Sequence, residues 1–272
     1  MTYVERAPAK INLSLRVLGK RDDGCHEIET LMVPLGGIED ELNFDLQLGQ
    51  GDVKLQCDDA QLPVGKDNLV MRAIRTFCSA TGTAFCGDVV LSKRIPSGAG
   101  LGGGSSDAAA TLRALNKLSG SELSLTKLRS LAGEIGADVA FFIAPAPSLC
   151  VGRGEVVLPF TGKIPQREVI LLKPAFNVAS GWAYSSWAES EYLPGVDYAV
   201  QPASWGDVVN DLERPVFAKY LLLAAMKAWL LEQPETQFAM MSGSGSTVFA
   251  ILHECNETAP LRGRAVAEFG AS

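Results

Sequence analysis

The distribution of apolar and polar residues predicts strands in the first part of the chain. Between residues 11 and 17 every second position is apolar, which is the period of a strand with one buried face. The same alternation returns at residues 41–48, and Gly49-Gln-Gly51 then marks a turn into residues 52–57, so we expect a hairpin there. The other strands expected in this part are two short ones within 2–20 and single ones at 25–33 and 88–94.

Apolar residues at helical spacing, with capping residues at the ends, predict the helices. Asp67 or Asn68 can cap a helix that runs to about Ala80, and Ser124 can cap a helix from Leu125 to Ile135. In the second half we expect helices at 178–187, 217–231 and 259–269, a hairpin at 148–158, and strands at 169–172, 238–242 and 247–252. Strands and helices are interleaved without a regular strand–helix repeat, which predicts the α+β class.

A short polar stretch at residues 161–166, which contains a glycine and a proline, is the best candidate for a domain boundary. It divides the chain into an N-terminal domain, residues 1–160, and a C-terminal domain, residues 161–272. Neither domain shows an internal repeat or a low-complexity tract.

The residues between the expected strand at 88–94 and the helical pattern after Ala108 have an unusual composition. This stretch contains five glycines, Gly98, Gly100 and 102–104, and ends in Ser105-Ser106-Asp107. Glycines allow backbone N–H groups to converge where other residues cannot place them, and a helix N-terminus adds unpaired donors. We expect Ser105 or Ser106 to be the N-cap, and we interpret the whole stretch as a phosphate-binding loop.

Two common types of phosphate loop do not fit. No lysine followed by serine or threonine comes after the glycines, so the loop is not a Walker A motif. Gly98, Gly100 and Gly103 match the dinucleotide pattern, but an acid at a strand end about 20 residues later is missing. Glu122, the nearest acid, lies in what looks like a helix start. The remaining interpretation is a loop that supplies serine hydroxyls instead of a lysine.

Composition and charge exclude several classes of partner. The net charge is −7 with no basic block, so a nucleic-acid backbone is not expected to bind. No run of about 18 apolar residues and no apolar leader is present, which predicts a cytoplasmic protein that does not contact a membrane. The six cysteines are scattered without a Cys-x-x-Cys pair, so a zinc or haem site is not supported and reduced thiols are expected.

The chemistry of two ionisable residues stays open on spacing alone. Lys10 falls on the polar face of its strand, where a solvated lysine is the simpler interpretation. Asp138 lies between Gly136 and an apolar run, where it is either a cap or a functional carboxylate. His26 has no second ligand near it in the sequence.

Three stretches of the chain resemble the three motifs of the GHMP kinase superfamily. They are Pro8-Ala-Lys-Ile-Asn12, Pro96-Ser-Gly-Ala-Gly-Leu-Gly-Gly-Gly-Ser-Ser-Asp107 and Met241-Ser-Gly-Ser-Gly-Ser-Thr247. The resemblance runs from about residue 5 to the end and implies a two-lobed fold. Three further stretches are similar to a branch that phosphorylates the 2-hydroxyl of a cytidine-diphosphate-linked polyol: residues 23–30, 136–139 and 210–213.

The resemblance implies a role for each matching residue. ATP would be the phosphoryl donor, with Mg²⁺ approached by Ser105 or Ser106. Asp138 would take the proton of the substrate hydroxyl, and Lys10 beside it would favour the ionised carboxylate and stabilise the transferred group. The loop residues implied to bind ATP are Pro96, Gly98, Gly100, Leu101, Gly102, Gly103, Gly104, Ser105 and Ser106. The residues implied to bind substrate are Asn12, Cys25, His26, Ser180, Tyr184, Gly243 and Ser244.

The chain departs from the family pattern at the cytidine end. In the family an aromatic residue usually precedes the histidine and stacks on the base, whereas this chain has Cys25 before His26. Losing one stacking partner weakens base stacking by about 1–3 kcal/mol. This change motivates one alternative, a GHMP kinase for another small alcohol. A second alternative is a non-catalytic sensor of nucleotide and sugar. The expected assembly is a monomer or a homodimer.

Overall fold

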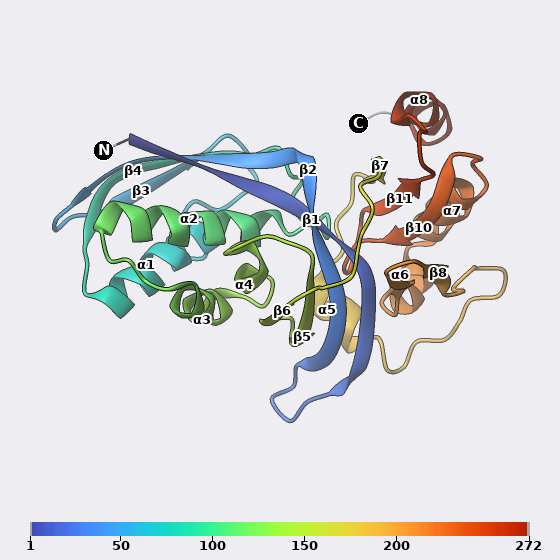
Figure 1. Cartoon of the computed structure of the whole chain (residues 1–272), viewed down its shortest axis with the longest axis horizontal. Coiled ribbons are helices and arrows are strands. Elements are labelled where there is room, and N and C mark those ends of the chain that lie inside the picture. Colours follow the sequence, from blue (N-terminus) through green and yellow to red (C-terminus); the bar gives the residue numbers. More distant parts are fainter. Residues whose placement is uncertain (1, 271–272) are drawn as a thin grey trace. The chain divides into compact units, whose positions relative to one another are not determined.

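The computed structural model describes residues 2–270, which divide into two compact units (Figure 1). Unit 1 consists of residues up to Lys10, Met32–Ser97 and Gly102–Pro159, and unit 2 of Ile11–Leu31, Gly98–Leu101 and the residues from Phe160 on. Compared with the expected division after residue 160, the segments 11–31 and 98–101 fall in the other unit. No helix of the described residues is long and apolar enough to span a membrane.

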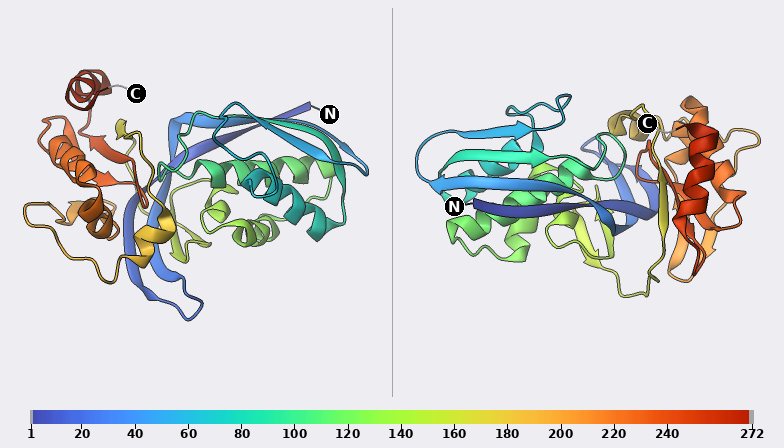
Figure 2. Two further views of the ribbon diagram at one scale, coloured as in Figure 1. Left: turned by 180° about the vertical axis from the view of Figure 1, so that it is seen from behind. Right: turned by 90° about the horizontal axis from the view of Figure 1, so that it is seen from above.

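Unit 1 is a sheet with helices on one face. Its strands follow the spatial order β3-β4-β2-β1, and β5 pairs with β2 and β6. Figure 1 and Figure 2 show α1, α2 and α3 on one face of these strands. The elements of unit 1 include the first part of β1 (Thr2–Lys20) and the larger, later part of β2 (His26–Leu48). The others are β3 (Val53–Cys57), α1 (Leu69–Thr81), β4 (Phe85–Ser92), α2 (Gly103–Ser119), α3 (Leu125–Ile135), α4 (Val139–Phe142), β5 (Ser148–Gly152) and β6 (Val156–Pro159).

The core of unit 1 lies between this sheet and its helices. Phe44 of β2, Phe77 of α1, Leu112 of α2 and Phe141 of α4 are fully buried and belong to one cluster. Fully burying such a side chain contributes about 1.5–3 kcal/mol, so this cluster fixes α2, which carries predicted site residues, and α4, which directly follows Asp138.

Unit 2 contains a three-stranded antiparallel sheet in the order β10-β11-β7. Helix α7 contacts β10 and β11, and the second part of β1 pairs in parallel with β9 through Ser14 and Val209. The elements are β7 (Val169–Leu172), α5 (Ser180–Ser185), β8 (Gln201–Ala203), β9 (Gly206–Asn210), α6 (Glu213–Lys219), α7 (Leu221–Leu231), β10 (Thr236–Met241), β11 (Val248–Leu252) and α8 (Thr258–Phe269).

Several local predictions are confirmed. Asn68 caps α1 by accepting the N–H of Val70, and Ser124 caps α3 by accepting that of Lys127. The boundaries of α3 and β7 agree with the expected ranges, and β5 and β6 form the expected hairpin. These elements depend on capping and short-range pairing, which the local sequence specifies.

The expected hairpin of residues 41–48 with 52–57 is wrong. Strand β4 lies between the two segments: it pairs antiparallel with β2, joining Glu41 to Ser92, and parallel with β3, joining Val53 to Gly87. Helix α1 provides the long crossover that a parallel pair requires. The expected break within residues 2–20 is also wrong, because Pro8 costs at most one ladder hydrogen bond and β1 continues through it.

The long helix expected at 217–231 is wrong as well, because it is two helices that meet at Tyr220. This residue has φ −120° and ψ 73°, outside the helical region. Its ring stacks on Phe176 with 5.0 Å between ring centroids and contacts the edge of Trp182. The aromatic contacts hold the residue between the helices, and periodicity alone does not reveal them. The helix expected at 178–187 is shorter, and the short strands β8 and β9 were not predicted.

Candidate active site

The glycine-rich loop has the backbone that its composition predicts. Gly98, Gly100 and Gly102 have positive φ angles of 63°, 77° and 76°. Helix α2 begins at Gly103 and its N-cap is Gly102, so the prediction that Ser105 or Ser106 is the N-cap is wrong. Gly102 adopts the left-handed conformation at no steric cost, and its carbonyl accepts the N–H of Ser106 at 2.9 Å, so the helix begins earlier than the serines suggest.

The two serines of the loop differ in exposure. Ser105 is partly exposed, whereas Ser106 is fully buried in the first turn of α2. The Ser106 hydroxyl has no hydrogen-bond partner among the described residues. A buried polar atom without a partner, at a helix N-terminus after three left-handed glycines, fits a site for an anionic group. Ser105 is the serine that solvent or an ion can reach.

Lys10 and Asp138, both in unit 1, form an ion pair. The Lys10 Nζ lies 3.7 Å from Asp138 Oδ2, and the side chains are 3% and 36% exposed. Burial lowers the pKa of Lys10, and the carboxylate of Asp138 opposes that shift. Asp138 precedes α4 but its side chain makes no capping bond, so capping does not explain the residue. The pair leaves one carboxylate facing solvent with a buried ammonium beside it.

In unit 2 the first half of the loop is fixed against the third motif. Ser242 donates its hydroxyl to the carbonyl of Gly100 at 3.0 Å, and the N–H of Thr247 donates to the carbonyl of Ala99 at 3.1 Å. A Cβ on Gly100 would overlap the carbonyl oxygen of Ser242 and lie 2.9 Å from that of Gly245. Only glycine fits at this contact.

The third motif is itself held by Asn210, at the end of β9. Its amide donates to the carbonyls of Met241 and Gly243 at 2.7 Å each, and it accepts the N–H of Leu212. Asn210 lies in the stretch 210–213 that resembles the family, but no role was predicted for its side chain.

The residues predicted to bind the nucleoside gather in unit 2. The ring of His26 stacks on Tyr184 with 5.5 Å between centroids, and Ser180 and Ser244 share a hydrogen bond of 2.7 Å. Cys25 is partly exposed next to His26. Asn12 is different, because it is 3% exposed and donates to Thr30 at 2.7 Å, so its amide is committed within the fold.

Trp187 is a further aromatic residue that sequence reasoning did not select. Its ring meets His26 edge-on at 6.4 Å, and the Arg214 guanidinium lies 5.5 Å from its centroid and donates to its carbonyl. The signal in the sequence was its position three residues after Tyr184, at the end of the helix expected at 178–187. In the structure Trp187 follows the end of α5, and its N–H donates to the carbonyl of Tyr184 at 3.1 Å.

A cavity of about 380 Å³ lies at the start of the loop in unit 1. The lining residues are Asp58, Asp59, Lys93, Arg94, Ile95 and Pro96. Of these only Pro96 was predicted as a site residue. The volume of the cavity is within the range of small-molecule pockets. No three His, Cys, Asp or Glu side chains among residues 2–270 gather into a group that could hold a metal.

Comparison with known proteins identifies the family. Residues 68–145 match the family model described as GHMP kinases N terminal domain. A 4-diphosphocytidyl-2-C-methyl-D-erythritol kinase of Methylacidiphilum infernorum (isolate V4) is 42% identical over 250 residues, which cover 90% of this chain and 84% of that protein. The chain belongs to the 4-diphosphocytidyl-2-C-methyl-D-erythritol kinase family.

Solved structures agree with this family. A crystal structure of 4-(cytidine 5'-diphospho)-2C-methyl-D-erythritol kinase is 32% identical, has a TM-score of 0.76, and covers 99% of this chain and 96% of its own. A homoserine kinase from Cytophaga hutchinsonii, 19% identical with a TM-score of 0.64 over 98% and 90% of the two chains, shows the shared fold. The α+β class and the GHMP kinase fold predicted from the sequence are therefore confirmed, and the chain is a member of a kinase family.

Proposed function

We propose that the chain transfers the γ-phosphoryl group of ATP to the 2-hydroxyl of 4-diphosphocytidyl-2-C-methyl-D-erythritol. The observation that carries this proposal is the ion pair of buried Lys10 with solvent-facing Asp138, in a chain of this kinase family. Phosphoryl transfer needs positioning and charge neutralisation more than covalent chemistry, and these residues supply both.

Asp138 is the proposed base. Its carboxylate accepts the proton of the substrate hydroxyl while the hydroxyl oxygen forms a bond to the γ-phosphorus and the bond to the ADP oxygen breaks. The Lys10 side chain is buried and cannot swing out into water. Its ammonium is therefore held beside the carboxylate, where the transferred group would lie. An ammonium at this position stabilises charge that develops on the phosphoryl oxygens.

The loop is the proposed site for the phosphates of ATP, which the backbone N–H groups of the left-handed glycines and the first turn of α2 bind. Ser105 is the proposed ligand that approaches Mg²⁺, since Ser106 is buried. Mg²⁺, when bound with the nucleotide, neutralises phosphate charge. The cavity beside Pro96 supports a place for the nucleoside part of ATP.

His26, Tyr184 and Trp187 are proposed to bind the cytosine. His26 can form hydrogen bonds with the edge of the base, and Tyr184 offers a ring for stacking. Trp187, next to His26, offers an aromatic surface that can take the place of the aromatic residue that the family usually has where this chain has Cys25. Ser180 and Ser244 offer hydroxyls in the same unit.

The test is turnover of ATP with a panel of acceptors, namely the cytidyl substrate, mevalonate and homoserine. We expect turnover with the cytidyl substrate alone, and we expect Asp138→Asn to lose it by at least about a hundredfold while ADP still binds. Asp88→Asn, a change of an exposed carboxylate on β4, is the control. Preference for mevalonate or homoserine would refute the assignment, and wild-type protein that binds ADP but turns over no acceptor would indicate a sensor.

A further inference from the structure

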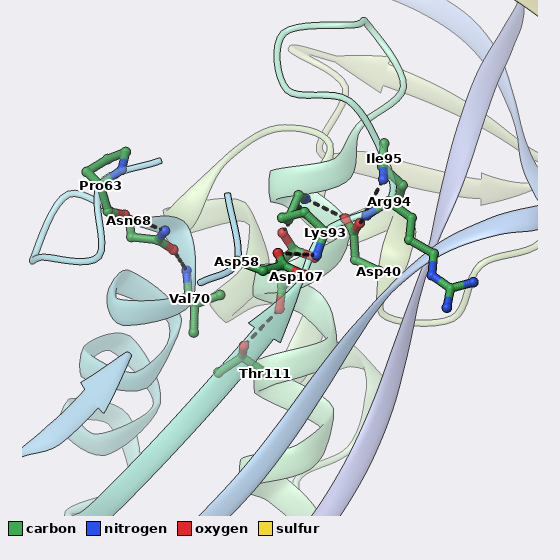
Figure 3. A network of polar contacts seen from close by, with 10 residues as sticks. All are labelled: Asp40, Asp58, Pro63, Asn68, Val70, Lys93, Arg94, Ile95, Asp107 and Thr111. Carbon is green, nitrogen blue, oxygen red and sulfur yellow. Dashed lines mark hydrogen bonds and ion pairs between the residues drawn. The ribbon is translucent and has the colours of Figure 1, made fainter. Parts of the chain in front are cut away.

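Three ionisable residues that take no part in the proposed proton and phosphoryl transfer form a buried cluster in unit 1; one of them, Lys93, also lines the cavity beside Pro96. The cluster consists of Asp40, Lys93 and Asp107, whose side chains are 0%, 7% and 4% exposed (Figure 3). Lys93 Nζ donates to Asp107 Oδ2 at 2.9 Å and also to Asp40 Oδ2. Lys93 precedes the glycine-rich loop in the chain and Asp107 follows it, so the cluster joins the two ends of the loop.

Backbone contacts extend the cluster into the chain that enters the loop. Asp40 Oδ1 accepts the N–H of Arg94 at 2.6 Å and that of Ile95 at 2.8 Å. One carboxylate therefore holds the side chain of Lys93 and the two residues after it. Figure 3 shows these bonds converging on Asp40 from one segment. Hydrogen bonds to a charged acceptor are stronger than neutral ones, so this entry segment has little freedom.

The exit of the loop is fixed by Asp107, in the second turn of α2. Its carbonyl accepts the hydroxyl of Thr111 inside the helix, and its carboxylate accepts Lys93. Lys93 Nζ lies 3.2 Å from the position that a Cβ on Gly103 would occupy. The ammonium is therefore packed against the first residue of α2, and a side chain at Gly103 would have to displace it slightly.

Stability alone does not account for three ionisable side chains at this place. Burying a charge is expensive, and well-packed apolar residues are often as stable as a buried ion pair. Burial lowers the pKa of Lys93, but Asp107 and Asp40 outweigh it and raise the pKa overall, so the ammonium stays charged. Burial raises the pKa of Asp107 to about 7, and the Lys93 ammonium opposes that shift. What an apolar cluster cannot supply is the directional bonding that sets the separation of the two ends of the loop.

We propose that Asp40, Lys93 and Asp107 are positioning residues that hold the two ends of the glycine-rich loop in the conformation that binds nucleotide phosphates. The proposal rests on the proposed function, since it assigns the loop to ATP. A loop whose ends are fixed in advance loses less entropy when it binds a ligand. Its conformation should therefore affect nucleotide affinity much more than affinity for the acceptor.

The test compares Asp107→Ala, Asp107→Asn and a matched control. Asn keeps an acceptor for Lys93, whereas Ala removes it. Glu5→Gln is the control, because Glu5 accepts Arg113 of the same helix at 2.9 Å and lies apart from the loop in sequence. The readouts are the Kd of ADP by titration calorimetry, the KM values of ATP and acceptor, and hydrogen exchange of the amides at 98–104 without ligand.

For Asp107→Ala we expect the Kd of ADP and the KM of ATP to rise on the order of tenfold, the cost of one charged hydrogen bond. The KM of the acceptor should change less than about twofold, and amides 98–104 should exchange faster. Asp107→Asn should recover most of the affinity, and Glu5→Gln should bind ADP like the wild type. If Asp107→Ala folds and binds ADP like Glu5→Gln, with unchanged exchange, the cluster is only structural and the proposal is refuted.

Should Asp107→Ala not fold, Asp40→Asn carries the test. It keeps an acceptor for the backbone amides and weakens the bond to Lys93, so the same direction of change is expected, and an unchanged Kd refutes the proposal. The exchange readout needs no ligand, and ADP binding needs no turnover. A wild-type protein that binds ADP without phosphorylating any acceptor therefore refutes the proposed function and leaves this test intact.

Discussion

Replacing Gly100 by alanine tests whether the loop must meet the third motif as closely as it does. Gly100 has a φ of 77°, and its added Cβ would overlap the carbonyl oxygen of Ser242. That oxygen belongs to the backbone and cannot turn aside as a flexible side chain could. We therefore expect the loop to move away from the turn at 242–247 or the turn to distort.

The loss in the free energy of unfolding of Gly100→Ala follows from the conformational cost, the clash and the contacts that are lost. The left-handed conformation costs an alanine about 1–2 kcal/mol, and overpacking adds about 1–3 kcal/mol. Movement of the loop also breaks the bonds of Ser242 to Gly100 and of Thr247 to Ala99, worth about 1 kcal/mol each. Because movement relieves part of the clash, these costs overlap, and we expect a loss of roughly 3–5 kcal/mol in the free energy of unfolding.

Gly195→Ala is the matched control, because Gly195 is in the same unit with a φ of 79° and nothing within 4 Å of its added Cβ. It should lose only the backbone cost of about 1–2 kcal/mol. Urea unfolding followed by tryptophan fluorescence is the assay, since all four tryptophans lie beyond residue 160 and report on unit 2. Equal losses for Gly100→Ala and Gly195→Ala would show that the close approach to Ser242 has no energetic weight.

Three further variants examine the ion pair of unit 1 and the predicted nucleoside-binding residues of unit 2. Lys10→Met should be inactive yet more stable at neutral pH, because burial lowers the Lys10 pKa and so penalises the ammonium. Between the pKa of Lys10 in the folded protein and its unfolded value of about 10.5, Lys10 binds more protons in the unfolded chain than in the folded one. The free energy of unfolding of the wild type therefore rises with pH in that range. The advantage of the variant in urea unfolding should then shrink from pH 7 to pH 10, and a constant difference would contradict the lowered pKa. Tyr184→Ala should weaken CDP binding by about 1–3 kcal/mol in calorimetry and leave ADP binding unchanged. Cys25→Tyr should tighten CDP binding if the cytosine lies beside His26, and no change would argue for another position of the base.

The glycine-rich loop and the capped helices could be predicted from the sequence, because their signals are local. A left-handed backbone requires glycine, and a cap requires a short polar side chain next to its own helix, as Asn68 and Ser124 show. The start of α2 was predicted wrongly because the local signal misled: serines are strong capping residues, so Ser105 or Ser106 was expected to be the N-cap. Here Gly102 adopts the capping conformation first.

Residues that act through partners far apart in the sequence could not be predicted. Asp40 lies 54 positions from Arg94, whose N–H it accepts, and nothing in its own neighbourhood marks it as a contact of the loop. The alternation at 41–48 established a strand without identifying its neighbour, so β3 was paired with the wrong partner. Tyr220 interrupts an apolar run of helical spacing through rings at 176 and 182 that only the fold brings together.

Lys10 shows how the two kinds of information combine. On spacing alone it was most simply a solvated lysine of a strand, and its resemblance to a family motif implied a catalytic role. The structure provides a physical reason to set the solvated interpretation aside, because the side chain is 3% exposed with Asp138 beside it. Burying a lysine costs stability, and a well-packed apolar residue at such a place is often at least as stable. The cost is therefore itself an argument for function at Lys10, whereas the exposure of Asp138 argues for access of a substrate to the carboxylate.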